Sequence, residues 1–520
     1  MGNHELAIPS VCKGREELKI FRQAMRDCCQ DNDLAAEAGK FETTRREFVQ
    51  GSIAMAGSLF ASSAGKISAP VQSKEKPPNI VFFLGEGTRH DALSIAGNTI
   101  AKTPSHDRIG REGMMFRNAF CTNALCAPAR ATLLTGLYSR STGALSNKRL
   151  EVPLPFDIPL VTDLLRDAGY EIAIVGKVHI HNGVEERHWD YYFGHNDAAN
   201  NYVNPIFKEG RNGNVGEAKQ YMGVYPDDLA VDRALSWLES RQSDKPFCLL
   251  VWFVAPHEPF FRARRYFDLY SEGTVVPRPA SFDDDLKNYP GKPRCFAAAR
   301  NKIGTSWEHK SCASLEGMVK DYYAGLAAVD DNIGRISGFL ESRGVLDDTA
   351  ILYTSDHGYF LGEWRLFDKR LMHEPSIRVP MMMRYPKRIP AGTIRNETIL
   401  DIDVAPTILD LAGLPGPSHF QGKSLLPLAQ GTDASFRAEW YYHYYQGGAE
   451  SPENRGIRTE QFKLIHYPVE EPQEFELYHL ATDTREENNL YGHPQYAALQ
   501  QNLWNRMQEL EKAIPARPAL

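Results

Sequence analysis

The sequence predicts an α/β fold, in which helices sandwich a large, mostly parallel mixed sheet and a small antiparallel subdomain follows at the C-terminus. Two observations lead to this prediction. Short continuous apolar runs are typical of strands that are buried on both faces, as in parallel sheets. Segments with apolar residues three or four positions apart lie between these runs, and strands that alternate with helices imply a parallel sheet covered on both faces.

The apolar runs predict five strands, in the order 79–84, 171–175, 247–254, 350–354 and 379–383. The helical patterns predict helices over 160–168, 228–240 and 318–340. The last of these is the longest, because its apolar positions continue from Met318 to Leu340. Beyond about residue 430, we expect two short antiparallel strands at 462–467 and 476–478 and a final amphipathic helix over 494–510.

We divide the chain into a leader with its linker (1–77), a catalytic domain (78–430) and a C-terminal subdomain (431–520). Arg45 and Arg46 precede a moderately apolar stretch of small residues, which resembles a twin-arginine signal and predicts export, to the periplasm. The alternative is a short surface helix. The apolar run is too short to span a bilayer, and we expect no integral membrane segment after it.

The composition restricts the classes of partner. Lysine and arginine number 59 against 66 acidic residues, and no basic stripe occurs, so nucleic acid is not an expected partner. The eight cysteines do not have the spacing of a zinc site or of a disulfide framework. A chain with a net charge of −7 that acts on an anionic substrate must concentrate positive charge locally.

Polar side chains follow four of the predicted strands. In open α/β sheets, ligands bind beyond the carboxyl ends of the strands. A single histidine there is usually structural, but acids, histidines and lysines after four strands are expected to share one crevice. In chain order, these residues are Glu86, Lys177, His179, His257, Asp356 and His357, with Lys369 shortly afterwards.

These side chains suit a metal beside a cluster of positive charge. Glu86, Asp356 and His357 could hold a hard cation, because calcium and magnesium prefer oxygen ligands. Arg130, Lys177 and Lys369 supply positive charge. A divalent metal beside cationic groups suits a tetrahedral oxyanion, which is either sulfate or phosphate.

The segment from Cys126 to Arg130, Cys-Ala-Pro-Ala-Arg, resembles the signature of the type I, formylglycine-dependent sulfatase family. By itself it could also be a buried cysteine at the start of a helix, or a thiol nucleophile paired with a histidine base. Together with the strand-end residues it identifies the chain as similar to this family of the alkaline phosphatase superfamily, over about residues 78–510. The branch directed at polysaccharides, with N-acetylglucosamine-6-sulfatases and iduronate sulfatases, is the most similar.

The resemblance implies a reaction as well as a fold. A formylglycine-generating enzyme would oxidise Cys126 to formylglycine, the nucleophile that releases sulfate from a sulfated sugar or polysaccharide. His257, alone or with Lys369, would be the general acid to the leaving sugar oxygen. Asp356 would help to accept the proton of the attacking hydroxyl, and His179 would steady the hydrate and take a proton from its second hydroxyl. The implied catalytic residues are Cys126, Arg130, Lys177, His179, His257 and Lys369. The implied metal ligands are Glu86, Cys126, Asp356 and His357, with Ca²⁺ as the expected ion and Mg²⁺ as the alternative.

One position departs from the family pattern. The family usually carries two consecutive aspartates after the first strand, where this chain has Glu86 and Gly87. Glycine supplies no ligand, so we expect weaker metal binding. The alternative functions are a phosphonate or phosphodiester hydrolase of the same superfamily, a degenerate protein that binds sulfated glycans without turnover, and a plain cysteine hydrolase. The segments 195–202 and 441–445 could contact a sugar or be structural.

Overall fold

The computed structural model describes residues 76–147, 154–180, 183–197, 202–271, 273–282, 291–294, 296, 314–432, 436–447, 451–469 and 471–517. The expected leader, including its paired arginines, lies outside the described residues. In the part of the chain that the structure describes, none of the helices combines the length and the apolar character needed to cross a membrane.

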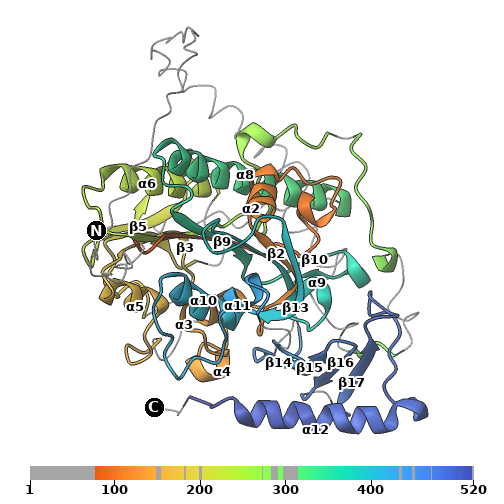
Figure 1. Ribbon diagram of the computed structural model, residues 1–520. Coiled ribbons are helices and arrows are strands. Elements are labelled where there is room, and N and C mark those ends of the chain that lie inside the picture. Colours follow the sequence, from red (N-terminus) through yellow and green to blue (C-terminus); the bar gives the residue numbers. More distant parts are fainter. Residues whose placement is uncertain are drawn as a thin grey trace, which may run out of the picture. The chain divides into compact units, whose positions relative to one another are not determined.

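A large mixed sheet forms the centre of the fold and confirms the predicted class (Figure 1). Its strands, in spatial order, are β13 (Thr393–Leu400), β2 (Met114–Phe120), β12 (Arg378–Arg384), β9 (Thr349–Ser355), β1 (Asn79–Gly85), β8 (Phe247–Trp252), β3 (Glu171–Lys177), β4 (Tyr191–His195), β5 (Ile206–Arg211) and β6 (Asn214–Val215), and β7 (Lys219–Gln220) pairs with β5. The five strands from β9 to β4 run parallel to one another. Strand β12 is antiparallel to both of its neighbours, β2 and β9.

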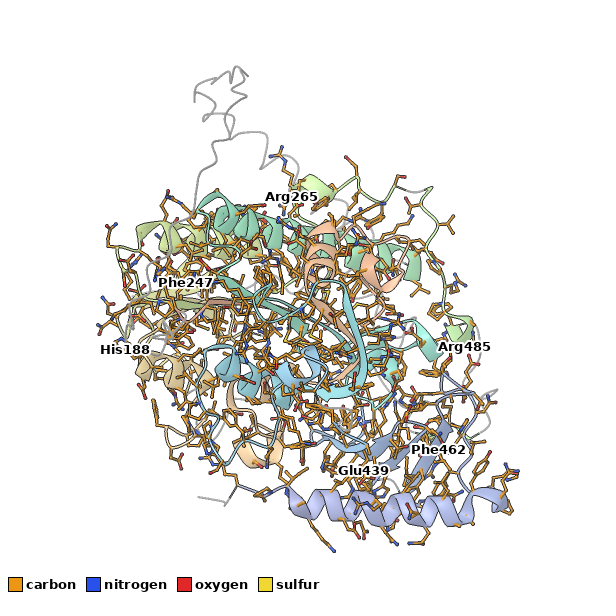
Figure 2. All side chains as sticks on the ribbon, in the orientation of Figure 1. His188, Phe247, Arg265, Glu439, Phe462 and Arg485 are labelled. Atoms are coloured by element: carbon orange, nitrogen blue, oxygen red, sulfur yellow. The ribbon has the colours of Figure 1, made fainter. Side chains whose placement is uncertain are left out.

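Helices cover both faces of this sheet, as Figure 1 shows. One layer holds α2 (Pro104–Glu112), α6 (Pro226–Ser240) and α8 (Leu315–Ser342), and the other holds α3 (Cys126–Thr135), α5 (Val161–Asp167) and α10 (Val404–Leu411). Successive residues of β1 face opposite layers: Phe82 packs with the α3 layer, whereas Val81 and Phe83 pack with the α8 layer. This alternation explains why β1 is a continuous apolar run in the sequence. Side chains fill the space between the sheet and both layers (Figure 2).

The smaller sheet is antiparallel and lies beside the large one (Figure 1). It consists of β14 (Glu439–Tyr444), β15 (Asn454–Thr459), β16 (Phe462–Tyr467) and β17 (Glu474–His479). Helix α12 (Ala497–Ala513) packs on one of its faces, and the other face meets residues of the large domain such as Phe120 and Leu125. The boundary expected at residue 430 stays a prediction.

Several elements were not expected from the sequence. Strand β13 lies at the edge of the large sheet, with β2 next to it. The first part of β13 alternates between partly buried and exposed residues, and β2 is interrupted by the exposed Arg117, so neither is a continuous apolar run. Strands β4, β5 and β15 were also missed, whereas β14 covers most of the segment 441–445, for which a structural role was the alternative to a sugar contact. The final helix begins three residues later than expected, after a short 3₁₀ turn at Pro494–Tyr496. Tyr441, Tyr442 and Tyr444 are buried, so these three rings have no exposed face on which a sugar could stack.

Candidate active site

The carboxyl ends of four parallel strands lie side by side, since β9, β1, β8 and β3 are adjacent in the sheet. Glu86 follows β1, and Asp356 follows β9. Lys177 is the last residue of β3, and His257 lies in the loop after β8. The topology therefore brings side chains from four distant parts of the sequence to one edge of the sheet.

Helix α3 adds two more side chains to this edge. Cys126 is the first helical residue, and Arg130 lies four positions later, so both point from the same face of the helix. Pro128 stands in the first turn, where the missing N–H breaks no helical hydrogen bond. Both Cys126 and Arg130 are fully buried.

Glu86 is at the centre of the cluster. Its Oε2 accepts hydrogen bonds from Lys177 Nζ at 2.7 Å and from Arg130 Nη2 at 2.8 Å. Burial opposes ionisation of this carboxyl, but Lys177 and the other cations around it hold its pKa well below the usual range. Its second oxygen, Oε1, lies 3.3 Å from Cys126 Sγ and 3.4 Å from His357 Nε2. Glu86 is therefore ionised, and one of its oxygens faces the nucleophile candidate.

Arg130 holds the carboxylates of Glu86 and Asp356 in place. Its Nε donates to Asp356 Oδ2 at 3.0 Å, while its Nη2 donates to Glu86. Its Nη1 donates to the carbonyl of Lys177, and its guanidinium lies 5.4 Å from the centre of the Trp252 ring. In this arrangement Arg130 fixes the orientation of the carboxylates.

Four side chains form a candidate metal centre. One ligand atom from each of Glu86, Cys126, Asp356 and His357 lies within 4.8 Å of all the others. Opposite ligands of calcium are separated by about 5 Å, because each lies about 2.3–2.6 Å from the ion. His357 Nδ1 is 2.8 Å from the carbonyl of Gly358, which directs Nε2 toward the cluster. The donor set and its spacing therefore fit a hard divalent cation.

The thiol of Cys126 lies among cations. Its Sγ is 3.8 Å from Lys177 Nζ and 3.4 Å from His357 Nε2. Burial and Glu86 oppose ionisation, but Lys177, Lys369 and His357 hold the pKa of this thiol well below its usual range. The surroundings therefore favour negative charge at the position of Sγ.

His257 and Lys369 form the outer part of the site. Lys369 Nζ lies 3.5 Å from His257 Nε2, and that nitrogen lies 3.8 Å from Glu86 Oε1. His257 Nδ1 is 2.7 Å from the carbonyl of Glu258, so Nε2 faces the cluster. With 7% of its surface exposed, His257 is the most accessible of the catalytic candidates. The His257 side is therefore the least buried part of the cluster.

Comparison with known proteins identifies the family to which the chain belongs. A family model described as "Sulfatase" matches residues 78–414, and one described as "N-sulphoglucosamine sulphohydrolase, C-terminal" matches residues 362–513. An N-acetylglucosamine-6-O-sulfatase of Bacteroides thetaiotaomicron is 33% identical, over 87% of this chain and 90% of the relative. The chain belongs to the sulfatase family.

A solved structure and a further relative extend this result. The solved structure, described as a complex with its substrate D-glucosamine-2-N,6-O-disulfate, is 32% identical with a TM-score of 0.75, over 84% of this chain and 98% of that chain. A multifunctional alkaline phosphatase superfamily protein of Trinickia caryophylli is 31% identical, over 76% of this chain and 87% of the relative. The protein is therefore a sulfatase-family hydrolase of the alkaline phosphatase superfamily.

The structure of this sulfatase-family enzyme also places the remaining predicted residues. His179 is buried just after β3, with a φ of 50°, and burial lowers its pKa to about 4. Gly87 has a φ of 62°, and its N–H donates to Asp356 Oδ1 at 3.1 Å. The backbone at Gly87 thus orients a candidate metal ligand, although the residue offers no ligand of its own.

Sequence reasoning gave His195 no specific role beyond a polar loop. The residue ends β4, directly beside Lys177 in the sheet, and is 5% exposed. Among the described residues, neither of its ring nitrogens has a hydrogen-bond partner. Its carbonyl accepts from the N–H groups of Val178 and His179 and so fixes the turn that carries His179. The pairing of β3 with β4 would have been the signal, but β4 was not predicted.

Proposed function

We propose that the protein hydrolyses sulfate esters of amino sugars, with 6-O-sulfated N-acetylglucosamine as the first substrate to test. The observation that carries the proposal is the position of Cys126 beside the carboxylate of Glu86 and the ammonium of Lys177. The named activity of the B. thetaiotaomicron relative and the disulfated glucosamine in the related structure support the choice of sugar.

Conversion of Cys126 to formylglycine supplies the nucleophile. An unmodified thiol that attacked sulfur would leave a product with no second hydroxyl on the same carbon through which to expel sulfate. The hydrate of formylglycine has that hydroxyl, so sulfate leaves as the aldehyde is restored. The partner in this step is a formylglycine-generating enzyme. We also propose that the protein is exported after folding, so that Cys126 is modified in the cytoplasm.

The side chains around Cys126 have distinct roles in this proposal. Lys177 and Lys369 neutralise charge on the sulfuryl oxygens, and Arg130 keeps both carboxylates oriented. His257 protonates the leaving sugar oxygen with the assistance of Lys369, whose Nζ lies 3.5 Å from His257 Nε2. That nitrogen faces the cluster, and His257 is the most accessible of these residues. His179, whose neutral form is favoured by burial, accepts a proton from the second hydroxyl of the formylglycine hydrate as sulfate leaves.

A divalent cation completes the proposed site. Glu86, Asp356, His357 and the modified residue 126 would hold Ca²⁺, with Mg²⁺ as the alternative. Such an ion would contribute positive charge that stabilises the oxyanion of the transition state. The fixed orientations of Asp356 and His357, held by Gly87 N–H and the Gly358 carbonyl, prepare the ligands for it.

Two alternative functions remain to be separated from this one. The multifunctional relative supports a test of phosphonate and phosphodiester hydrolysis. Gly87 motivates the third candidate, a protein that binds sulfated glycans without turnover. The cations around Cys126 favour an anionic ester but do not by themselves distinguish sulfur from phosphorus.

The test is a comparison of rates on matched esters. The protein is co-expressed with a formylglycine-generating enzyme, and kcat/KM is measured for 6-O-sulfated N-acetylglucosamine and for aryl sulfate, phosphodiester and phosphonate esters. We expect the sulfated sugar to be the best substrate and the Cys126→Ala variant to be inactive on all of them. A preference for phosphorus esters would support a phosphonate or phosphodiester hydrolase. Binding of the sulfated sugar without turnover would support a non-catalytic glycan-binding protein.

A further inference from the structure

The hydroxyl of Tyr442 connects two segments of the active site. Tyr442 lies in β14 of the small sheet and is fully buried. Its hydroxyl donates to the carbonyl of Arg370 at 2.7 Å, next to Lys369, and accepts from the N–H of Ala124 at 3.2 Å, two residues before Cys126. A phenol hydroxyl has one donor and can accept as well, so one oxygen serves both contacts.

The segment around Lys369 needs such support, because its backbone is strained. Lys369 lies after the short hairpin of β10 (Phe360–Leu361) and β11 (Phe367–Asp368). Its two neighbours have positive φ angles, 82° for Asp368 and 95° for Arg370, and neither is glycine. Such conformations are energetically unfavourable and persist only where the surrounding structure holds them in place.

A second residue of the small sheet holds the same segment. Asn454, in β15, donates from Nδ2 to the carbonyl of Arg370 at 3.2 Å. Its Oδ1 accepts from the N–H of Met372 at 3.1 Å. Asn454 is also fully buried. Tyr442 and Asn454 thus fix the backbone on the C-terminal side of Lys369, but Tyr442 alone also contacts the segment that leads to Cys126.

We propose that Tyr442 is a positioning residue, through which the small sheet fixes the separation of Cys126 and Lys369. The inference deepens the proposed function and rests on it. The C-terminal sheet therefore acts on the active site through this contact, although none of its strands supplies a side chain to the cluster. Removal of the hydroxyl would leave the Arg370 carbonyl and the Ala124 N–H without this partner and release the strained segment.

The experiment compares Tyr442→Phe with Tyr467→Phe. Tyr467 is a buried residue of the same sheet, and its hydroxyl donates to Glu476 at 2.6 Å, away from both catalytic segments. Both variants are co-expressed with the formylglycine-generating enzyme, and rates are divided by the aldehyde content of residue 126 from peptide mass. For a series of aryl sulfates, we expect Tyr442→Phe to lower kcat about tenfold or more, with KM changed less than about threefold.

The dependence on the leaving group separates positioning from a general loss of stability. A displaced Lys369 would assist the leaving oxygen less, so kcat of Tyr442→Phe should fall most steeply for the most basic phenols. Tyr467→Phe should keep the wild-type kcat and the wild-type dependence. If Tyr442→Phe does not fold, Asn454→Ala is expected to give the same steeper dependence.

Failure of the positioning role of Tyr442 can be distinguished from failure of the proposed function. If wild-type protein with the aldehyde does not hydrolyse sulfate esters, the proposed function fails. If the wild type is active, but Tyr442→Phe and Tyr467→Phe have the same kcat and the same leaving-group dependence, the positioning role of Tyr442 is wrong.

Discussion

Two buried ionic clusters of this protein contain similar residue types but differ in how completely their charges are paired. One is the active-site cluster around Glu86. The other, which we call the C-terminal ion cluster, lies beneath the small sheet and consists of Glu374, Arg458, Lys463 and Glu486. All four residues of the C-terminal ion cluster are buried, with at most 7% of their surface exposed.

In the C-terminal ion cluster, Lys463 uses its full donor capacity. Its Nζ donates to Glu486 at 2.6 Å, to Glu374 at 2.9 Å and to the carbonyl of Met372 at 2.9 Å. In the active site, Lys177 donates to one oxygen of Glu86, and its next contact among the described residues is Cys126 Sγ at 3.8 Å. We infer that the fully paired buried charges of the C-terminal ion cluster stabilise the fold, whereas the incompletely paired charges of the active site remain available for a ligand.

The largest effect on stability is expected from Lys463→Met. The substitution leaves the carboxylates of Glu374 and Glu486 buried without their ammonium partner. We expect the free energy of unfolding to fall by about 3–5 kcal/mol, measured by denaturant titration. If Lys463→Met changed the free energy of unfolding as little as a surface substitution does, the proposed difference between the two clusters would be wrong.

The corresponding active-site variant, Lys177→Met, should act mainly on catalysis. Arg130 still pairs with Glu86 in this variant, so we expect a smaller loss of stability than for Lys463→Met. Loss of one oxyanion-stabilising group lowers kcat by about 10²–10³-fold. Sulfate release per aldehyde-containing protein is the measurement, and a kcat close to wild type would remove Lys177 from the proposed mechanism.

Acid should weaken the C-terminal ion cluster. Burial opposes ionisation of Glu374, but Arg458, Lys463 and Arg378 hold its pKa well below the ordinary value of 4.5. Because the folded pKa is lowered, the unfolded state binds more protons, and the stabilisation present above about pH 4.5 is lost as the pH falls. We expect Glu374→Gln to have a lower Tm at about pH 7 and a shallower loss of Tm from about pH 5 to about pH 3. Parallel curves for the variant and the wild type would contradict this.

The smallest of the expected effects is a change in metal binding on substitution of Gly87. A Cβ there would lie 3.3 Å from Tyr359 Cδ2 and 3.6 Å from His357 Cε1, beside a candidate ligand. Aspartate tolerates the positive φ of this position better than most residues do. We expect Gly87→Asp to raise the chelator concentration for half-inactivation by about two- to tenfold. Gly87→Ala supplies the same Cβ without a carboxylate and should not raise it.

The sequence was informative where burial or chemistry leaves a local pattern. The strands that support the site are continuous apolar runs, and the candidates outside helix α3, such as Glu86, Lys177 and Asp356, lie at or just after the ends of these strands. Strand β13 left no such pattern, because it alternates at an exposed edge. Tyr442 could not be assigned either, since the hydroxyl contact with Ala124 joins residues 318 positions apart. Such contacts depend on how two sheets pack, which no local pattern reports.

The most direct test of the account is the mass of the tryptic peptide 118–130 from protein co-expressed with the formylglycine-generating enzyme. This peptide contains both Cys121 and Cys126, so Cys121 is an internal control for alkylation. We predict one alkylated thiol, at Cys121, and an aldehyde at position 126, in proportion to the sulfatase activity of the sample. Two alkylated thiols in a sample with full activity would contradict the proposed nucleophile.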